Sequence, residues 1–378
     1  MNKLVYKEIA IFHPGYYVKE LIDDLSMTQD ELAKRLSTSA KTISKLVNGE
    51  INLTDEMALR LSIVFNTSID MWLNLNKKFI EKKLDIEKSK NDSAQIEIIK
   101  NIDYKFWENL GLVDSARQSI DKVRELQRYL QVSDLNVLKR NDFLVQYRTA
   151  IQEVSEKNII NANAWVQTAI NIGREIDVAK FDVKKFNSII PQIRELTVQK
   201  PAIFSENLRT LLSSCGVALV ILPSLKNAGV NGAVKWLTAD KVILAINNRR
   251  QYADIFWFSL FHEIGHVLQR RITQLIISSE KDMLDRDDAM QILEDEADSF
   301  AQNILIHEDE YIKFINNGVF TEYSIIEFAG RINIQPGIVL GRLQKERYVP
   351  YNTTLNSIKE KYIFLNCIKS ILPPFIRL

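Results

Sequence analysis

The chain has 378 residues, of which 46% are hydrophobic and 26% charged, and its formal net charge is +1. This length exceeds what one hydrophobic core usually organises, so we expect two or three domains, and the composition excludes a fibrous or largely disordered protein. A net charge near zero gives no global attraction to nucleic acid, so a DNA-binding interpretation depends on a local basic cluster.

Cysteine usage and hydropathy indicate the compartment. Cys215 and Cys367 lie far apart and form no C-x-x-C pair, which is typical of a reducing environment. The N-terminal segment lacks the apolar core of a secretory signal, and no stretch reaches the ~18 uninterrupted apolar residues of a membrane span. We therefore expect a soluble, cytoplasmic protein with no membrane partner.

Two short helices joined by a polar turn are predicted between residues 28 and 48. Thr28 is placed to cap the first helix, with Glu31 completing a capping box. The second helix, residues 40–48, directs Ile43, Leu46 and Val47 inward and ends at Gly49. This spacing predicts a helix-turn-helix whose second helix enters a major groove of DNA.

The candidate DNA contacts are polar and basic side chains of these two helices and their turn. They can donate to base edges or phosphates and supply the local positive charge that the whole chain lacks. They are Gln29, Lys34, Arg35, Ser39, Lys41, Thr42, Ser44 and Lys45. Asp30 and Glu31 lie nearby, so a helical hairpin that contacts only protein stays open as an alternative.

A longer segment around these helices resembles a known family. His13-Pro14-Gly15 at its start, Asn48-Gly49 in its middle and residues 67–75 at its end resemble the HigA-type antitoxins of the Cro/C1 (XRE) helix-turn-helix class. The resemblance implies a homodimer that binds a palindromic operator in double-stranded DNA and represses its own operon. It also implies a toxin as a protein partner.

The middle of the chain, residues 77–200, is predicted to be helical. The charged run at 77–83 indicates a solvated helix or a linker, and the residues from about 94 onward follow a helical period. Trp107, Tyr147 and Trp165 could line a ligand pocket, but at helical spacing we expect them to pack in a core.

The C-terminal part begins with a small sheet. Residues 217–222 and 241–246 predict short strands, and helices follow from about residue 254, with loops near 278–288 and 348–354. The fold class is therefore mainly α with a small β-sheet (α+β). The predicted domains are a helix-turn-helix domain at 1–76, a helical middle domain at 77–200 and a third domain at 201–378.

The segment His262-Glu263-Ile264-Gly265-His266 contains two of the four histidines of the chain. On a helix, two imidazoles four residues apart lie on one face and can share a Zn²⁺ ion. Glu263 directly after the first histidine is placed to act as a general base toward water at the metal. The structural alternative is a pair of core histidines.

A catalytic zinc site needs a third protein ligand. The acidic helix at 293–301 supplies candidates, and we expect Glu296 to be this ligand, with Glu294 as the alternative. Asp298 is then a candidate acceptor for the free imidazole N–H of a ligand histidine, which would fix its tautomer.

These two motifs, H-E-I-G-H and E-D-E-A-D-S-F-A, resemble the ImmA/IrrE family of metallopeptidases, and the resemblance covers roughly residues 200–362. It implies a zincin-like fold and zinc-dependent proteolysis, often of a regulator, with the strand at 242–246 offering its edge to an extended substrate. His307 stands where this family commonly has Pro. Four residues are chemically able to stabilise an oxyanion: Tyr252, His307, Tyr311 and Arg342.

Two functions follow as hypotheses. The first is a DNA-binding regulator or antitoxin fused to a zinc metallo-endopeptidase that cleaves a regulatory protein. The second is a non-proteolytic antitoxin and repressor whose zinc domain is structural or a sensor, and a general degradative protease is disfavoured. Cys215 beside Gly216 could bind the metal as an inhibitory thiolate, but we expect a buried apolar role.

Overall fold

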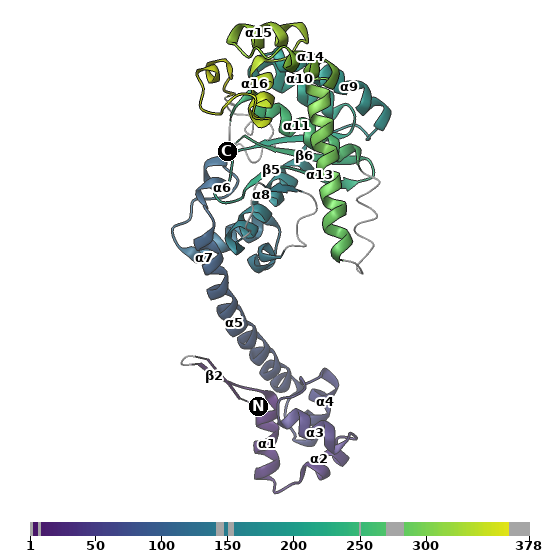
Figure 1. Cartoon of the computed structure of the whole chain (residues 1–378). Helices are drawn as coiled ribbons and strands as arrows, with labels where there is room; N and C mark the ends of the chain where they lie inside the picture. The colour runs from purple at the N-terminus through teal and green to yellow at the C-terminus, as the bar shows by residue number, and fades with distance from the viewer. Residues whose placement is uncertain are drawn as a thin grey trace. The chain divides into compact units, whose positions relative to one another are not determined.

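The computed structural model describes residues 3–6, 9–140, 147–149, 155–248, 251–269 and 283–362. For residues 3–6, 9, 147–149 and 283–291 it describes the backbone alone. The chain divides into two compact units between Ile96 and Glu97 (Figure 1). The three-part division at residues 76 and 200 stays a prediction. Every helix within the described ranges is too short or too polar to cross a membrane.

The first unit combines a two-stranded antiparallel sheet with helices. The strands β1 and β2 are absent from the sequence-based prediction. The helix α5 begins in this unit and ends in the next, so the charged run at 77–83 is helical. The elements are β1 (Lys3–Tyr6), β2 (Ile9–Phe12), α1 (Pro14–Asp24), α2 (Gln29–Arg35), α3 (Ala40–Val47), α4 (Asp55–Val64) and α5 (Ile69–Asn101).

The helices of this unit pack around one apolar core. Ile43, Leu46 and Val47 of α3 are buried in it, as predicted. Trp72 of α5 is also fully buried, and its indole N–H donates to Thr67 Oγ1 at 2.8 Å. After α3, Gly49 adopts a φ of 70°, a left-handed conformation in which glycine carries no steric cost.

The second unit is built on a four-stranded sheet of order β3-β5-β6-β4. The strand β6 pairs in parallel with β4 and antiparallel with β5, and β3 pairs antiparallel with β5. The strands are β3 (Tyr147–Thr149), β4 (Val217–Leu222), β5 (Val230–Thr238) and β6 (Lys241–Asn247). The predicted strands match β4 and β6, whereas β3 and β5 are additional.

This strand order corrects one expectation. The resemblance to metallopeptidases implies that the strand at 242–246 offers an edge to a substrate, but β6 is internal and bonded on both sides. An internal strand has no unpaired backbone groups for an added peptide. The motif helix packs against both β5 and β6, and β3 occupies part of the outer edge of β5.

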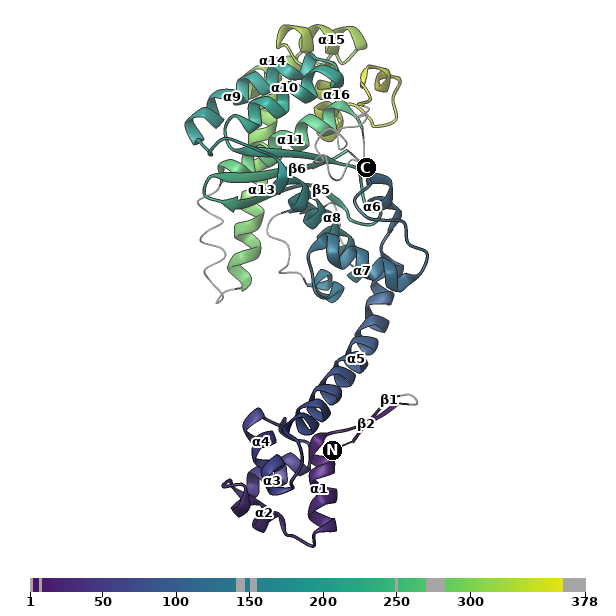
Figure 2. The same ribbon diagram turned by 180° about the vertical axis from the view of Figure 1, so that it is seen from behind.

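Helices cover both faces of the sheet. The helix α8 packs on one face, and α11 packs on the other against β5 and β6 (Figures 1 and 2). Val242, Leu244 and Ile246 of β6 join α11 in the large core of this unit, as alternate positions of a strand do. The α11 helix is thereby held between the sheet and the helices α13 and α16.

The helices of the second unit have the following bounds: α6 (Lys105–Leu110), α7 (Ser119–Leu130), α8 (Glu156–Glu175), α9 (Val183–Glu195), α10 (Pro201–Ser213), α11 (Ala253–Leu268), α13 (Met283–Leu305), α14 (Glu308–Asn316), α15 (Glu322–Arg331) and α16 (Pro336–Lys345). Short 3-10 helices lie at Leu135–Lys139, Leu196–Val198 and Thr354–Ile358. The predicted loop at 278–288 is wrong from residue 283 onward, where α13 begins, and residues 278–282 lie outside the described ranges.

Two of the three middle-region aromatics are core residues, as expected. Trp107 and Trp165 are fully buried, and their indole N–H groups donate to Thr168 Oγ1 and to the Pro223 carbonyl, both at 2.9 Å. The side chain of Tyr147 lies outside the described residues.

Candidate functional site

Side-chain caps fix the start of both helices of the helix-turn-helix. Thr28 Oγ1 accepts the Glu31 backbone N–H at 3.1 Å, and Ser39 Oγ accepts the Thr42 N–H at 3.1 Å. Of the predicted capping box, the structure shows the hydrogen bond from the Glu31 N–H to Thr28. The Glu31 carboxylate accepts a hydrogen bond from Arg35 at 2.6 Å. Ser39, a predicted DNA contact, also shares a 2.8 Å hydroxyl contact with Thr42.

Some basic residues of the helix-turn-helix form ion pairs with acidic side chains, and others do not. Lys34 pairs with Asp30 at 3.1 Å and Arg35 with Glu31 at 2.6 Å, each within α2. Among the residues that the structure describes, Lys41 and Lys45 of α3 form no ion pair, and both are exposed. Gln29, Thr42 and Ser44 are half-buried. The uncompensated positive charge of the motif therefore lies on α3.

The two motif histidines lie on one face of α11. The His262 side chain is fully buried and that of His266 is 10% exposed, and His262 Nε2 lies 2.9 Å from His266 Nε2. His262 Nδ1 lies 2.8 Å from Asp298 Oδ1, which is the predicted contact of that carboxylate, and His266 Nδ1 lies 2.8 Å from Gln269 Oε1. Gln269 Nε2 donates to the Leu293 carbonyl at 2.9 Å, which directs its oxygen to His266.

Glu294, the alternative in the sequence analysis, completes this cluster. Its carboxylate oxygens lie 3.3 Å from His262 Nε2 and 3.2 Å from His266 Nε2, and the three groups can hold one metal ion. Burial raises the pKa of Glu294, but hydrogen bonds with both imidazoles outweigh it and hold the pKa below its ordinary value. For His266, burial lowers the pKa, but the contacts with Glu294 and Gln269 and the charge of Glu263 together outweigh it, and the pKa is raised.

The structure does not bring the expected Glu296 into this cluster. Its side chain is exposed and accepts a 3.3 Å hydrogen bond from Gln269. The reason is helical geometry: Glu294 and Asp298 are four residues apart and share the face of α13 that meets α11, whereas Glu296 points about 200° away from Glu294 around the axis. The i, i+4 spacing of Glu294 and Asp298 is the sequence signal that identifies this face.

Glu263 is almost completely buried, at 1% exposure. It lies against β5 at Gly232, where a Cβ atom would stand 2.4 Å from Glu263 Oε1. A side chain at position 232 would therefore displace the Glu263 carboxylate. Because glycine has no Cβ, the carboxylate fits against β5 at this position. Gly232 belongs to the segment whose resemblance to metallopeptidases was noted, and the contact gives that glycine a physical role.

The other candidates of the C-terminal part occupy different places. Cys215 is buried, its thiol donates to the carbonyls of Leu211 and Leu212, and burial raises its pKa to about 11, which disfavours a metal-binding thiolate. His307 is the exposed N-cap residue of α14, with no side-chain cap, and its Nδ1 lies 3.7 Å from Asp309.

The remaining oxyanion candidates lie outside the three-residue cluster. The Arg342 guanidinium stacks 3.7 Å from the ring centroid of the buried Tyr311 and pairs with Glu308 at 2.6 Å. Tyr252 and Arg342 line a pocket beside the cluster. The oxyanion-stabilising residue stays unassigned.

Comparisons with known proteins concern the helix-turn-helix. A helix-turn-helix family model matches residues 18–72. The uncharacterized HTH-type transcriptional regulator YddM of Escherichia coli is 35% identical over 79 residues, which are 20% of this chain and 84% of YddM. YbaQ, another such regulator of Escherichia coli, is 43% identical over 56 residues, which are 15% of this chain and half of YbaQ.

A solved structure of the Pseudomonas aeruginosa antitoxin HigA with the higBA promoter is similar over 21% of this chain and 87% of that chain, with 28% identity and a TM-score of 0.20. Residues 18–72, the caps of α2 and α3 and the relationship to YddM agree on one family. Through its N-terminal unit, the chain belongs to the helix-turn-helix family of DNA-binding transcriptional regulators.

Proposed function

We propose that this chain is a transcriptional regulator and antitoxin that reads an operator with α3 and carries a zinc-dependent peptidase in its second unit. The exposed Lys41 and Lys45 support α3 as the helix that approaches DNA, since phosphate contacts supply most of the affinity. The antitoxin role rests on the resemblance of residues 13–75 to HigA-type antitoxins, and a toxin is the corresponding partner.

We infer that the regulator acts as a homodimer in the cytoplasm. Leu59 and Ile63 lie one turn apart on α4 and are 48% and 71% exposed. An apolar pair of this kind on a small domain is suited to a symmetric contact between two copies, and such dimers bind the two halves of a palindromic operator.

The observation that carries the zinc proposal is the direction of the imidazole lone pairs. Asp298 and Gln269 offer oxygen acceptors, so each Nδ1 carries its hydrogen and each Nε2 of His262 and His266 presents a lone pair. These lone pairs face each other at 2.9 Å, beside a carboxylate. Three electron-pair donors converging in this way repel one another unless protons on the imidazoles or a metal ion lie between them. As metal ligands, two imidazoles and a carboxylate suit Zn²⁺.

His262, His266 and Glu294 would hold the zinc ion, and Asp298 and Gln269 would fix the two imidazole tautomers. Bound zinc supplies a Lewis acid and lowers the pKa of water. Glu263, adjacent in sequence to His262, would accept the proton of the attacking water and pass it to the leaving amine. The substrate is proposed to be a regulatory protein, either the toxin or another regulator.

Glu263→Gln tests this proposal. The variant keeps the volume and the contact with Gly232 and loses the base, so we expect unchanged zinc content and operator binding but no cleavage. The readout is the set of new N-termini produced from a proteome digest by the full chain. Cleavage at the wild-type rate would contradict the assignment of Glu263.

One observation favours the second function, a non-proteolytic repressor whose zinc domain is structural or a sensor. Glu263 is 1% exposed, and β3 occupies the edge of β5 that passes it. If neither the wild type nor Glu263→Gln produces new N-termini while both bind zinc, this alternative replaces the peptidase.

A further inference from the structure

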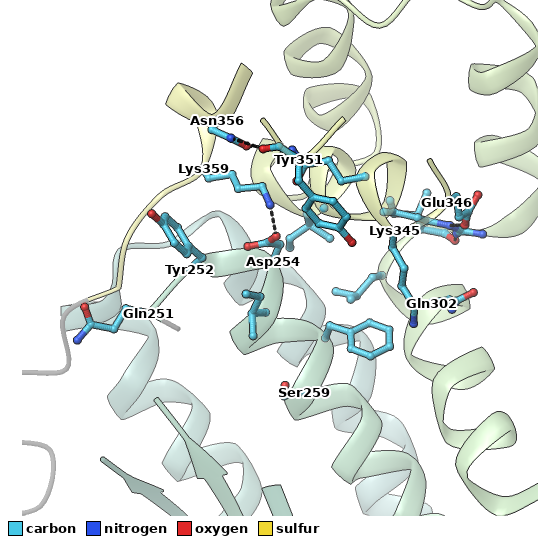
Figure 3. A pocket seen from close by; sticks show the side chains of 18 of the residues that line it. Gln251, Tyr252, Asp254, Ser259, Gln302, Lys345, Glu346, Tyr351, Asn356 and Lys359 are labelled. Carbon is cyan, nitrogen blue, oxygen red and sulfur yellow. Dashed lines mark hydrogen bonds and ion pairs between the residues drawn. The ribbon is translucent and has the colours of Figure 1, made fainter. Parts of the chain in front are cut away.

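A pocket of about 770 Å³ is lined by residues of α11, α13 and α16 and of the segment 351–361 (Figure 3). Its wall includes Phe258, one helical turn before His262 on α11, and Gln302, one turn after Asp298 on α13. The three candidate metal ligands do not line it. The pocket is therefore a separate space next to the cluster, and its volume is that of a small-molecule site.

The floor of this pocket holds a buried ion pair with an unused acceptor. Asp254 Oδ2 accepts from Lys359 Nζ at 2.6 Å, and both side chains are about nine-tenths buried. Asp254 Oδ1 is buried and has no hydrogen-bond partner among the described residues. A buried carboxylate oxygen without a donor costs free energy that a ligand N–H or O–H would recover. Because Lys359 balances the charge, a neutral donor fits.

Aromatic rings and amines surround this floor (Figure 3). Tyr252 and Tyr351 are 37% and 69% exposed, so their rings are available to a flat ligand. Lys361 Nζ lies 5.8 Å from the Tyr252 ring centroid, and Lys345 Nζ lies 4.6 Å from that of Phe258. Lysine amines beside aromatic faces suit a ligand that carries both a planar ring and an anionic group, phosphate above all.

We propose that this pocket binds a mononucleotide. The base stacks on the tyrosine rings and donates an amine or ring N–H to Asp254 Oδ1, and the phosphate contacts Lys361 and Lys345. The lining excludes His262, His266 and Glu294, so the ligand would not bind the metal itself. Lys345 also pairs with Asp298 at 3.5 Å, which links the pocket to the carboxylate beside His262.

Calorimetric titration of the full chain with AMP, GMP, CMP and UMP tests the proposal. We expect at least one of them to bind, and its nucleoside and inorganic phosphate to bind at least tenfold more weakly. Asp254→Asn, which replaces the anionic acceptor, should weaken binding at least tenfold, because a hydrogen bond to a charged acceptor is stronger than one to a neutral acceptor. Protein treated with a chelator should still bind the mononucleotide, because no candidate metal ligand lines the pocket.

Two exposed positions keep the test valid if Asp254→Asn does not fold. Tyr351→Ala and Lys361→Ala change only the rim and should each weaken binding several-fold, whereas Lys226→Ala, an exposed lysine outside the lining, should not. Absence of binding by all four mononucleotides at ~1 mM would overturn the proposal. The proposal would also be overturned if none of the pocket variants changed mononucleotide binding. Binding of an acidic peptide without binding of the mononucleotides would overturn it as well.

Discussion

The Nε2 atoms of His262 and His266 face each other at 2.9 Å while both Nδ1 atoms are engaged by oxygen acceptors. Two neutral imidazoles arranged in this way direct lone pairs at the same point. Glu294 adds negative charge beside them. A positive ion between the three groups would stabilise this arrangement, as proposed above, and the first predictions concern the residues that maintain it.

Asp298 is predicted to strengthen metal binding through His262. Asp298→Ala removes the acceptor of His262 Nδ1–H, so the tautomer and orientation of that ring are no longer fixed. We expect zinc affinity to fall ~10–100-fold. Competition of the full chain with a chromophoric chelator measures the change. Asp295→Ala, at an exposed neighbouring position, is the control, and equal affinities of the two variants would rule out the role of Asp298.

Gly232 is predicted to be required for the position of Glu263. In Gly232→Ala the new Cβ would stand 2.4 Å from Glu263 Oε1, so the carboxylate must move. We expect peptide cleavage to be lost while zinc content is kept. Gly330→Ala is the matched control, because a Cβ there meets no atom within 4 Å. Full cleavage by Gly232→Ala would show that the position of Glu263 is not critical.

The two exposed lysines of α3 are predicted to bind DNA phosphates. Removing one lysine–phosphate interaction should reduce the slope of log affinity against log salt concentration by about 1. In the proposed homodimer, Lys41→Ala with Lys45→Ala removes four lysines, so we expect the slope to fall by about 4. Lys34→Ala should change it less, because Lys34 is already paired with Asp30. Fluorescence anisotropy with a labelled operator at several salt concentrations measures the slopes. Equal slopes for the double variant and the wild type would exclude a phosphate-binding role for these lysines.

His13 is predicted to make the first unit less stable in mild acid. Its Nδ1 accepts the Gly15 N–H at 3.0 Å at the start of α1, and burial, with the charge of Lys83, lowers its pKa below the ordinary value of 6.5. As pH falls, His13 therefore takes up a proton at a higher pH in the unfolded chain than in the folded unit. The stabilisation is complete above pH 6.5 and is lost as pH falls through the lower, folded pKa.

Hydrogen exchange of α1 amides in the full chain, compared at about pH 7.5 and pH 5.5 after correction for intrinsic rates, measures this loss. His13→Asn keeps a capping acceptor without a titrating ring and should abolish the pH dependence. A wild-type dependence that persists in His13→Asn would assign it to another group.

Periodicity and capping signals were sufficient for the two helices of the helix-turn-helix, although not for the β1–β2 hairpin of the same unit. Thr28 and Ser39 cap α2 and α3, and Ile43, Leu46 and Val47 are buried, because each of these features is set by residues within one or two turns. The spacing of His262 and His266 likewise fixed their shared face on α11.

Features that depend on distant pairing were missed. The short strand β3 is defined by hydrogen bonds to β5 between residues more than 80 positions apart, which no local pattern encodes. The strand β5, which was also missed, pairs with the neighbouring β6 in a hairpin. The choice between Glu294 and Glu296 depended on which face of α13 meets α11. The pocket around Asp254 joins α11 to residues 351–361, so its unpartnered oxygen is visible only in the folded chain.

The zinc content of Glu294→Gln and Glu296→Gln tests the central claim most directly. Both variants remove one carboxylate from the same helix, but only Glu294 lies within 3.3 Å of both imidazoles. We predict one zinc ion per chain in the wild type and in Glu296→Gln, and its loss on dialysis from Glu294→Gln. Equal metal content in the two variants, or a wild-type chain that binds no zinc, would contradict the account.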